Sequence, residues 1–279
     1  MPSIAQSLRA VIKTLPGDSS RADAELLLAH ALERPRAWLY AHADDDLPDV
    51  TGKRFAQLIK RRLKGEPIAY LLGYREFWNM QLEVTADTLI PRPETELLVQ
   101  LTITDLPREQ AARVLDLGTG SGAIALAIAS ERPLAKVTAC DNSEAALEVA
   151  QRNAGRLAQD RCVWLRSDWF SELPGQRFDV IVSNPPYVAD EDPHLREGDL
   201  RFEPRMALTS GRDGLDAIRA IVNAAAQHLY PGGRLLIEHG FEQGASVRAL
   251  FQAAGLTDVR TVRDLEDRER VTCGLSPSD

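Results

Sequence analysis

The sequence has few cysteines and none of the patterns that form disulfide frameworks or zinc sites. Its 279 residues contain three cysteines, and no two of them make a Cys-x-x-Cys pair. The five histidines are scattered along the chain without the spacing of metal ligands. These shortages exclude a disulfide-stapled fold and a zinc finger. We expect reduced thiols, a cytoplasmic protein and no bound metal.

The chain also lacks a long apolar run and an excess of positive charge. Its longest hydrophobic stretch is far shorter than a membrane span, and no charged-then-apolar signal segment opens it, so we expect no membrane partner. The formal net charge is −8, which argues against a surface dedicated to a nucleic-acid backbone. Since 44% of the residues are hydrophobic, the chain can form a sizeable core, in one large domain or in one large and one small.

A glycine-rich turn lies in the middle of the sequence. Residues 113–129 read RVLDLGTGSGAIALAIA, with a branched apolar run before the glycines and a run of helix formers after them. Gly118, Gly120 and Gly122 allow a ligand to approach the main chain, where the free N–H groups of a helix start point at it. The sequence therefore predicts a ligand site at a strand-to-helix turn.

Two cofactors fit this turn by spacing. The first two glycines and Ala123 satisfy the loose dinucleotide pattern G-x-G-x-x-G/A. Asp116 and the third glycine instead resemble the D-x-G-x-G-x-G turn of S-adenosylmethionine-dependent methyltransferases. Asp141 ends the next predicted strand, where an acid accepts hydrogen bonds from two ribose hydroxyls of either cofactor. The turn alone therefore does not decide between NAD and S-adenosylmethionine.

A second motif decides between them. The segment Phe178–Tyr187 reads FDVIVSNPPY, and its apolar strand ends at Asn184 because Pro185 and Pro186 prevent a strand or a helix from continuing. Asn-Pro-Pro-Tyr after the fourth strand resembles the signature of methyltransferases that act on a planar –NH2 group, such as a base amine or a side-chain amide. The alternative is an ordinary turn. Behind a glycine turn of this kind we favour the methyltransferase.

Several smaller parts complete the predicted architecture. Apolar residues recur at helical spacing in residues 4–15, 22–31 and 55–63, which predicts a small helical bundle. Apolar and polar residues alternate in residues 77–84, as in a hairpin, before the proline-containing connector LIPRPETE at 89–96. Further strands are predicted at 136–140, 162–166, 234–238, 257–263 and 270–274, with a long charged loop at 191–214.

Taken together, the motifs resemble one family over nearly the whole chain. They are GEPIAYLLGYREFWNMQLEV, LIPRPETE, DLGTGSG and NPPY, and their combination is similar to the protein-(glutamine-N5) methyltransferase family. LIPRPETE joined to NPPY is highly specific, whereas the turn or NPPY alone is shared with many nucleic-acid methyltransferases. The resemblance implies a Rossmann-like α/β fold, the seven-stranded class I methyltransferase domain. We expect a helical substrate-recognition domain at 1–75, a hairpin and linker at 76–97, and the methyltransferase domain at 98–279.

The resemblance also implies S-adenosyl-L-methionine as cofactor. Asp116 would hold its methionine end, Trp169 would cover the adenine, and Asp168 would reach the edge of that ring. An alternative for Trp169 is a place in the core. The implied cofactor-binding residues are Asp116, Gly118, Thr119, Gly120, Ser121, Gly122, Asp141, Asp168, Trp169 and Asn184.

The implied catalytic and substrate-binding residues are Asn184, Pro185, Pro186 and Tyr187. An amide nitrogen is a poor nucleophile, and no histidine, cysteine or metal is placed by the sequence to activate it. The Asn184 side-chain oxygen and the Pro185 carbonyl would each accept one N–H of the substrate –NH2 group, while Tyr187 stacks on the amide plane. Both hydrogen bonds would strengthen as positive charge develops on the nitrogen.

The implied partner is a class I peptide-chain release factor, methylated on the glutamine of its Gly-Gly-Gln loop by a monomeric enzyme. Three alternatives remain at this stage. The substrate could be a glutamine of a ribosomal protein, or an adenine or guanine amine of nucleic acid. A non-catalytic module that binds the cofactor as a structural ligand is the third. We expect no direct contact with nucleic acid, because the basic segment Lys60–Lys64 is interpreted as a solvated helix face.

Overall fold

The computed structural model describes residues 1–109, 111–159 and 161–278, which fall into two compact units. The first unit comprises Met1–Tyr74 together with the distant segment Arg196–Phe202, and the second contains the rest of the described chain. In the described part of the chain, every helix is too short or too polar to cross a membrane.

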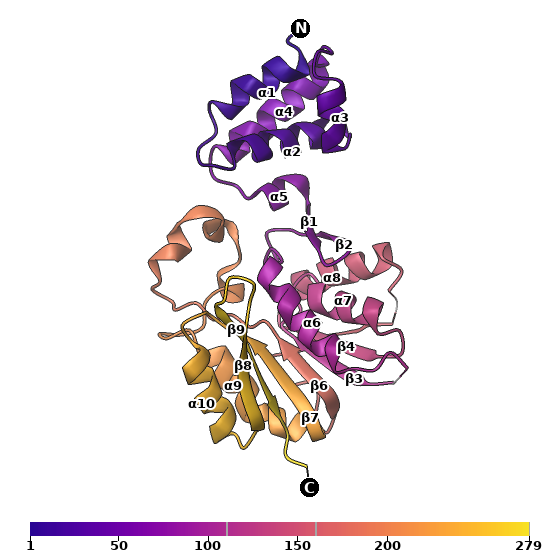
Figure 1. Ribbon diagram of the computed structural model, residues 1–279, viewed down its shortest axis with the longest axis vertical. Coiled ribbons are helices and arrows are strands. Elements are labelled where there is room, and N and C mark those ends of the chain that lie inside the picture. The colour runs from indigo at the N-terminus through magenta and orange to yellow at the C-terminus, as the bar shows by residue number, and fades with distance from the viewer. Residues whose placement is uncertain (110, 160, 279) are drawn as a thin grey trace. The chain divides into compact units, whose positions relative to one another are not determined.

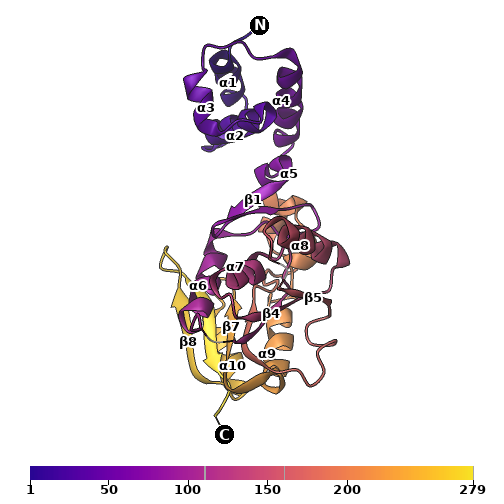
Figure 2. The ribbon, with the colours of Figure 1, turned by 90° about the vertical axis from the view of Figure 1, so that its right-hand side faces the viewer.

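The first unit is a helical bundle, and Figure 2 shows its first four helices packed together. The helices are α1 (Ile4–Ile12), α2 (Ser20–Leu32), α3 (Arg36–Ala41), α4 (Asp49–Arg62) and α5 (Ile68–Leu72). The buried side chains of Ile4, Leu27, Leu39 and Phe55 belong to one core. The sequence analysis did not predict α3 and α5, because helices of six and five residues are too short for an apolar periodicity to show.

The segment Arg196–Phe202 joins this unit through Arg62 of α4 and through its own Arg201. The Arg62 guanidinium contacts the carboxylate of Asp23 at 2.8 Å and that of Asp199 at 3.3 Å, and it donates to the Glu66 carbonyl at 3.1 Å. Arg201 donates to the Lys64 carbonyl at 3.2 Å. Two stretches more than 130 positions apart are therefore held together by charge-assisted hydrogen bonds.

A hairpin opens the second unit. Its strands are β1 (Tyr74–Phe77) and β2 (Met80–Glu83), as the alternation at 77–84 predicts. Phe77 and Leu82 are fully buried and pack in the same core as the central strands of the large sheet. The hairpin thus belongs to the hydrophobic core of the second unit rather than standing free as a spacer.

The large sheet has seven strands in the order β5-β4-β3-β6-β7-β9-β8, which confirms the predicted sheet. Only β9 runs antiparallel to its neighbours, and the other pairs are parallel. The strands are β3 (Arg113–Leu117), β4 (Lys136–Asp141), β5 (Val163–Arg166), β6 (Phe178–Ser183), β7 (Leu229–Glu238), β8 (Thr257–Arg263) and β9 (Glu269–Leu275).

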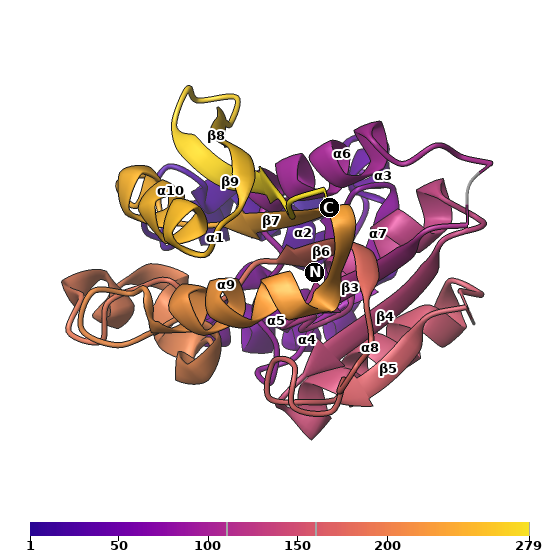
Figure 3. The same cartoon turned by 90° about the horizontal axis from the view of Figure 1, so that it is seen from below.

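Helices cover both faces of this sheet. Figure 3 shows α6 and α7 on one face and α9 and α10 on the other, and each face has its own buried cluster. The helices are α6 (Glu96–Thr104), α7 (Ala123–Glu131), α8 (Glu144–Arg156), α9 (Asp216–His228) and α10 (Gly244–Ala253) (Figure 1). The chain crosses from one half of the sheet to the other between β5 and β6, so β3 and β6 flank the position where open α/β sheets bind ligands.

Two predicted details need correction. The strand predicted at 234–238 begins earlier, at Leu229, and pairs with Phe178 before a register shift brings Arg234 opposite Val180. The strand therefore tolerates the intervening Pro-Gly-Gly as a bulge. The loop 191–214 is not without secondary structure, because it contains the short 3-10 helices η2 (Pro193–Arg196), η3 (Gly198–Phe202) and η4 (Arg205–Ala207).

Candidate active site

The glycine turn joins β3 to α7 and contains glycines with different tasks. All three have positive φ, +72° at Gly118, +56° at Gly120 and +84° at Gly122. Gly118 and Gly120 line a cavity at the carboxyl ends of the strands. A Cβ on Gly122 would instead lie 3.1–3.2 Å from Leu126, Trp164 and Ala150, so this glycine is required by close packing against the core.

Asp116 supports this turn from inside the protein. Its side chain is fully buried, and its Oδ2 accepts hydrogen bonds from the Thr119 hydroxyl at 2.7 Å and the Ala125 backbone N–H at 3.1 Å. Its Oδ1 has no hydrogen-bond partner among the described residues. Burial raises the pKa of Asp116 to about 7. Asp116, Thr119, Ser121 and Gly122 are not among the residues that line the cavity, so the predicted cofactor contacts of these four residues stay predictions.

Asp141, at the end of β4, does line the cavity. Its Oδ2 accepts from the Gly120 backbone N–H and its Oδ1 from the Ser143 backbone N–H, both at 2.9 Å. Burial raises the pKa of Asp141. Each carboxylate oxygen has a second lone pair, so Asp141 can organise the turn and still accept two hydroxyl groups.

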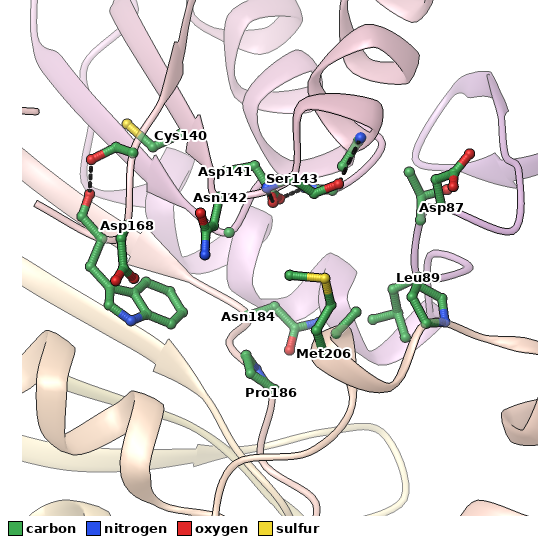
Figure 4. A pocket seen from close by; sticks show the side chains of 18 residues that line it. Asp87, Leu89, Cys140, Asp141, Asn142, Ser143, Asp168, Asn184, Pro186 and Met206 are labelled. Atoms are coloured by element: carbon green, nitrogen blue, oxygen red, sulfur yellow. Dashed lines mark hydrogen bonds between the residues drawn. The ribbon is translucent and has the colours of Figure 1, made fainter. Parts of the chain in front are cut away.

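The cavity has a volume of about 160 Å³ and lies within the second unit. Figure 4 shows Asp141 and Ser143 on one side of it, with Asn184 and Met206 facing them. The lining includes Asp168 and Trp169, whose cofactor contacts stay predictions, and also residues of the connector, of the two positions before it and of the long loop, namely Asp87, Thr88, Leu89, Pro204, Met206 and Ala207. The sequence analysis assigned none of these six, because no local pattern relates a connector to a loop that is distant in sequence.

Trp169 has an unusual backbone, with φ of +48°. This region is disfavoured for a bulky side chain, so the surrounding structure must hold it there. The Ser167 hydroxyl donates to the Trp169 carbonyl at 2.8 Å, and a Cβ placed on Gly118 would lie 3.6 Å from the indole ring. The indole therefore sits against the first glycine of the turn, on the wall of the cavity.

The Asn-Pro-Pro-Tyr segment follows β6 and brings two of its four residues to the cavity. Asn184 and Pro186 line it, whereas Pro185 is buried and Tyr187 is directed elsewhere. The Asn184 amide nitrogen donates to the Thr95 hydroxyl at 3.1 Å, and the Tyr187 hydroxyl donates to a Glu238 oxygen at 3.4 Å. The predicted stacking role of Tyr187 stays a prediction.

Glu238 is a buried carboxyl group that the sequence analysis missed. It is the last residue of β7 and is 1% exposed. Burial raises its pKa to about 7, although the Thr95 hydroxyl and the positive charge of Arg270 favour the ionised form. Its proximity to Tyr187 is one reason why the phenol pKa lies well above its usual range, after burial itself. The sequence did contain a signal for Glu238, because a charged residue at the end of an apolar strand is unusual.

Two further contacts hold the walls of the site. The buried Glu203 carboxylate accepts from the Ile90 backbone N–H at 2.9 Å and pairs with Arg92, so the connector is tied to the middle of the long loop. At Gly214, φ is +74° and a Cβ would lie 2.2 Å from the Tyr187 carbonyl oxygen. Only glycine allows the loop to approach the Asn-Pro-Pro-Tyr segment this closely.

The residues around the cavity fit a nucleoside cofactor. An acid with free lone pairs ends β4, an aromatic ring flanks the first glycine, and the backbone of the turn is open to a ligand. The unpartnered Oδ1 of Asp116 beneath the turn adds a buried acceptor. Among the described residues, no group of three or more His, Cys, Asp or Glu side chains is placed to hold a metal. The groups that the cavity presents to a ligand are therefore mainly hydrogen-bond acceptors and an aromatic ring.

Comparison with known proteins decides the family. The methyltransferase small domain model matches residues 94–198, and the PrmC N-terminal domain model matches residues 6–73. A release factor glutamine methyltransferase of Xylella fastidiosa is 52% identical over 277 residues, with 99% of each chain covered. The Escherichia coli protein of the same name is 50% identical over 268 residues, with 96% of each chain covered. This chain belongs to the release factor glutamine methyltransferase family.

Membership of the release factor glutamine methyltransferase family confirms the predicted family, enzyme class and cofactor, S-adenosyl-L-methionine. Among solved structures, a methyltransferase of Pyrococcus furiosus is similar with a TM-score of 0.55 and 18% identity, over 80% of this chain and 99% of that one. A T. thermophilus 16S rRNA methyltransferase is similar with a TM-score of 0.53 and 22% identity, over 73% and 49%. At such identities the likeness supports the fold alone.

Proposed function

We propose that this enzyme transfers the methyl group of S-adenosyl-L-methionine to the side-chain amide nitrogen of a glutamine in class I peptide-chain release factors, the glutamine of their Gly-Gly-Gln loop. The observation that carries this proposal is the identity of 50–52% over nearly the full length of relatives named for that activity. The position of Asn184, half-buried on the wall of the cavity, supports an amide as the reacting group.

In this proposal the cavity receives the nucleoside part of the cofactor. Asp141 accepts the two ribose hydroxyls with the lone pairs that Gly120 and Ser143 leave free. Trp169 covers the adenine, and Asp168 reaches the edge of the ring. Asp116 acts on the methionine end through its unpartnered Oδ1, while Oδ2 keeps the glycine turn in shape.

The cofactor, when bound, supplies a methyl group on a positively charged sulfur. Loss of the methyl group leaves that sulfur as a neutral thioether. The residues of this chain orient the nucleophile. Asn184 Oδ1 and the Pro185 carbonyl each accept one N–H, so that the nitrogen lone pair points at the methyl carbon from about 3 to 3.5 Å. Both acceptors favour the positive charge that develops on nitrogen, and the extra proton then leaves to water.

We also propose that the helical unit recognises the release factor, that the enzyme acts as a monomer, and that it works in the cytoplasm. The residues that form the cavity all lie in the second unit, which leaves the helical unit free for another task. The basic end of α4 supports a protein partner over a nucleic acid, because Arg61 pairs with Glu66 and Arg62 with Asp23 inside the unit. These pairs reduce the positive charge that a phosphate backbone would need.

The test uses radiolabelled S-adenosyl-L-methionine with the purified enzyme, a purified class I release factor, and the same factor with its Gly-Gly-Gln glutamine replaced by alanine. Labelling of the first factor and none of the second is the expected result. A parallel reaction with cell extract locates other acceptors. Label in nucleic acid or in a ribosomal protein, with the release factor unlabelled, would overturn the proposal in favour of an amine or ribosomal-protein methyltransferase.

A further inference from the structure

The side-chain amide of Gln243 joins three segments of the second unit. Its Nε2 donates to the Tyr187 carbonyl at 3.0 Å and to the Asp213 carbonyl at 3.3 Å, and its Oε1 accepts from the Gly240 backbone N–H at 2.9 Å. These partners belong to the Asn-Pro-Pro-Tyr segment, to the end of the long loop, and to the turn between β7 and α10. The mechanism proposed above gives no task to Gln243, which is not among the residues that line the cavity.

The three partners together require a primary amide. One of them is a donor and two are acceptors, so the side chain must present an oxygen at one end and an –NH2 group at the other. A carboxylate would place an oxygen against two carbonyl oxygens, and a thioether can donate to neither of them. Gln243 is the N-cap residue of α10, but within the described chain its side chain does not bond to the first turn of that helix. The amide is therefore committed to the other segments.

The long loop approaches the Asn-Pro-Pro-Tyr segment most closely at this amide. A Cβ placed on Gly214 would lie 2.2 Å from the Tyr187 carbonyl oxygen and 2.9 Å from Gln243 Nε2. The next residue after the motif, Val188, makes two main-chain hydrogen bonds of 2.9 Å to residues 208–210. The chain at positions 187 and 188 is thus fixed to the loop twice in succession, first by Gln243 and then by main-chain hydrogen bonds.

Both segments that Gln243 joins carry parts of the site. The Asn-Pro-Pro-Tyr segment brings Asn184 to the cavity, and the loop brings Met206 to the same side of it (Figure 4). The hydroxyl of Tyr187 reaches Glu238 only at 3.4 Å, which is long for a hydrogen bond between two oxygens. The placement of the Tyr187 ring therefore depends on its main chain, which Gln243 holds at the carbonyl.

We infer that Gln243 is a positioning residue for amide methylation, which holds the Tyr187 main chain against the long loop and so sets the placement of Asn184 and Tyr187 at the reacting amide. This role rests on the proposed function, since it requires a substrate amide to be held by the Asn-Pro-Pro-Tyr segment. Transfer depends on the nitrogen lying in line with the methyl carbon, so a small displacement of this segment lowers the rate. The contacts of Asp141 with the turn are separate from Gln243, so cofactor binding is spared.

Two variants and one control test this role. Gln243→Met keeps the length of the side chain and removes all three hydrogen bonds. Gln243→Glu keeps the shape and the acceptor for Gly240, but it turns a charged oxygen toward the carbonyls of Tyr187 and Asp213. Gln252→Met is the matched control, because Gln252 lies exposed on the same helix.

The first measurement is single-turnover methylation of the release factor at mildly alkaline pH with both substrates saturating, together with the S-adenosylhomocysteine affinity of each variant. We expect Gln243→Met to lower the rate about tenfold and Gln243→Glu about a hundredfold, with Gln252→Met at the wild-type rate. Cofactor affinity should stay within about twofold of the wild type in all, which also shows that each variant is folded. A role in packing alone predicts wild-type rates for both Gln243 variants, because both keep the length of glutamine. A wild-type rate in Gln243→Met, or a loss of cofactor affinity as large as the loss of rate, would overturn the inference.

The second measurement does not need turnover. Amide hydrogen exchange in residues 187–190 and 208–215 should be faster in both Gln243 variants than in Gln252→Met. At Gly240 it should be faster in Gln243→Met alone, since Gln243→Glu keeps the acceptor. Exchange that is unchanged in Gln243→Met would also overturn the inference. A wild-type enzyme that leaves the release factor unmethylated would instead overturn the proposed function, and the exchange result would still show whether Gln243 holds these segments, so the two failures are distinct.

Discussion

The side-chain amide of Asn184 donates a 3.1 Å hydrogen bond to the hydroxyl of Thr95, which lies 89 positions earlier in the chain. This bond joins the two most specific motifs of the sequence, the proline-containing connector and Asn-Pro-Pro-Tyr. The connector is therefore part of the site rather than a spacer. Its other end is fixed by Glu203, which accepts the Ile90 N–H and pairs with Arg92. The side-chain amide of Asn184 thus lies among segments that are distant in sequence and that meet in the second unit.

Replacement of Asn184 by alanine should abolish most of the turnover. Removing one preorganised acceptor from a transition state costs roughly 10²–10³ in rate, or about 2.7 to 4 kcal/mol. Single-turnover methylation at saturating concentrations of both substrates separates this loss from weaker binding. S-adenosylhomocysteine affinity should change much less than the rate.

Asn184→Asp is the informative variant to compare with Asn184→Ala. It keeps an oxygen acceptor, but it cannot donate to Thr95 and places a second carboxylate near Glu238. Partial activity is expected for aspartate and near-background activity for alanine. A wild-type rate in Asn184→Ala would remove Asn184 from the mechanism and revive the interpretation of Asn-Pro-Pro-Tyr as a structural turn.

Much of the cavity wall around the glycine turn could be predicted from the sequence, because local pattern determines it. A buried strand followed by glycines and helix formers gives the turn, and parallel strands end on the same edge, so Gly118, Gly120 and Asp141 were predicted to lie together. The structure brings all three to one cavity. Asp168 and Trp169 lie there for the same reason, at the end of β5.

The contacts around Asn-Pro-Pro-Tyr could not be predicted in the same way. Thr95 and Glu238 contact the Asn-Pro-Pro-Tyr residues across 89 and 51 positions, and no periodicity or spacing encodes such a contact. The segment Arg196–Phe202 is another case, since its attachment to the helical unit depends on Arg62 meeting Asp199. Such contacts depend on tertiary packing, and a single sequence does not reveal which distant residues meet.

Asp141→Ala should weaken S-adenosylhomocysteine binding by about 1.5 to 3 kcal/mol, the usual range for hydrogen bonds to a charged group. The structure gives a second reason for weaker binding: in Asp141→Ala the backbone N–H groups of Gly120 and Ser143 lose their acceptor. Asp141→Asn should lose less, since its oxygen still accepts from one of them. Isothermal titration calorimetry measures both. Unchanged affinity in Asp141→Ala, or binding of NAD by the wild type, would show that the cavity is wrongly assigned.

Arg62→Ala should loosen Arg196–Phe202 without unfolding the helical unit. Arg62 bridges Asp23, the Glu66 carbonyl and Asp199, so its loss releases the segment and leaves the Asp23 carboxylate unpaired. Amide hydrogen exchange in residues 196–202 should rise by roughly tenfold at most. Arg61→Ala is the control, because the neighbouring Arg61 contacts only Glu66 among the described ion pairs. Equal exchange in both variants would disprove the bridging role of Arg62.

Glu238→Gln should stabilise the protein at neutral and alkaline pH. Because burial raises the folded pKa of Glu238 from its ordinary 4.5 to about 7, the folded state binds a proton that the unfolded state releases. The stability that this proton confers is fully present below pH 4.5 and is lost as the pH rises through about 7. Glutamine does not titrate, so the variant should gain up to about 3 kcal/mol over the wild type between these limits, seen as a rising difference in melting temperature.

Glu25→Gln is expected to change stability in the opposite direction in the same experiment. Burial raises the pKa of Glu25, but hydrogen bonds from Arg21, Arg36 and Tyr40 outweigh it and hold the pKa below its ordinary value. The stability from this group is present at neutral pH and is lost as the pH falls through the lowered pKa. Glu25→Gln should therefore be less stable than the wild type at pH 7, with a difference that shrinks in acid. If the two variants changed stability with the same dependence on pH, the raised pKa assigned to Glu238 would be wrong.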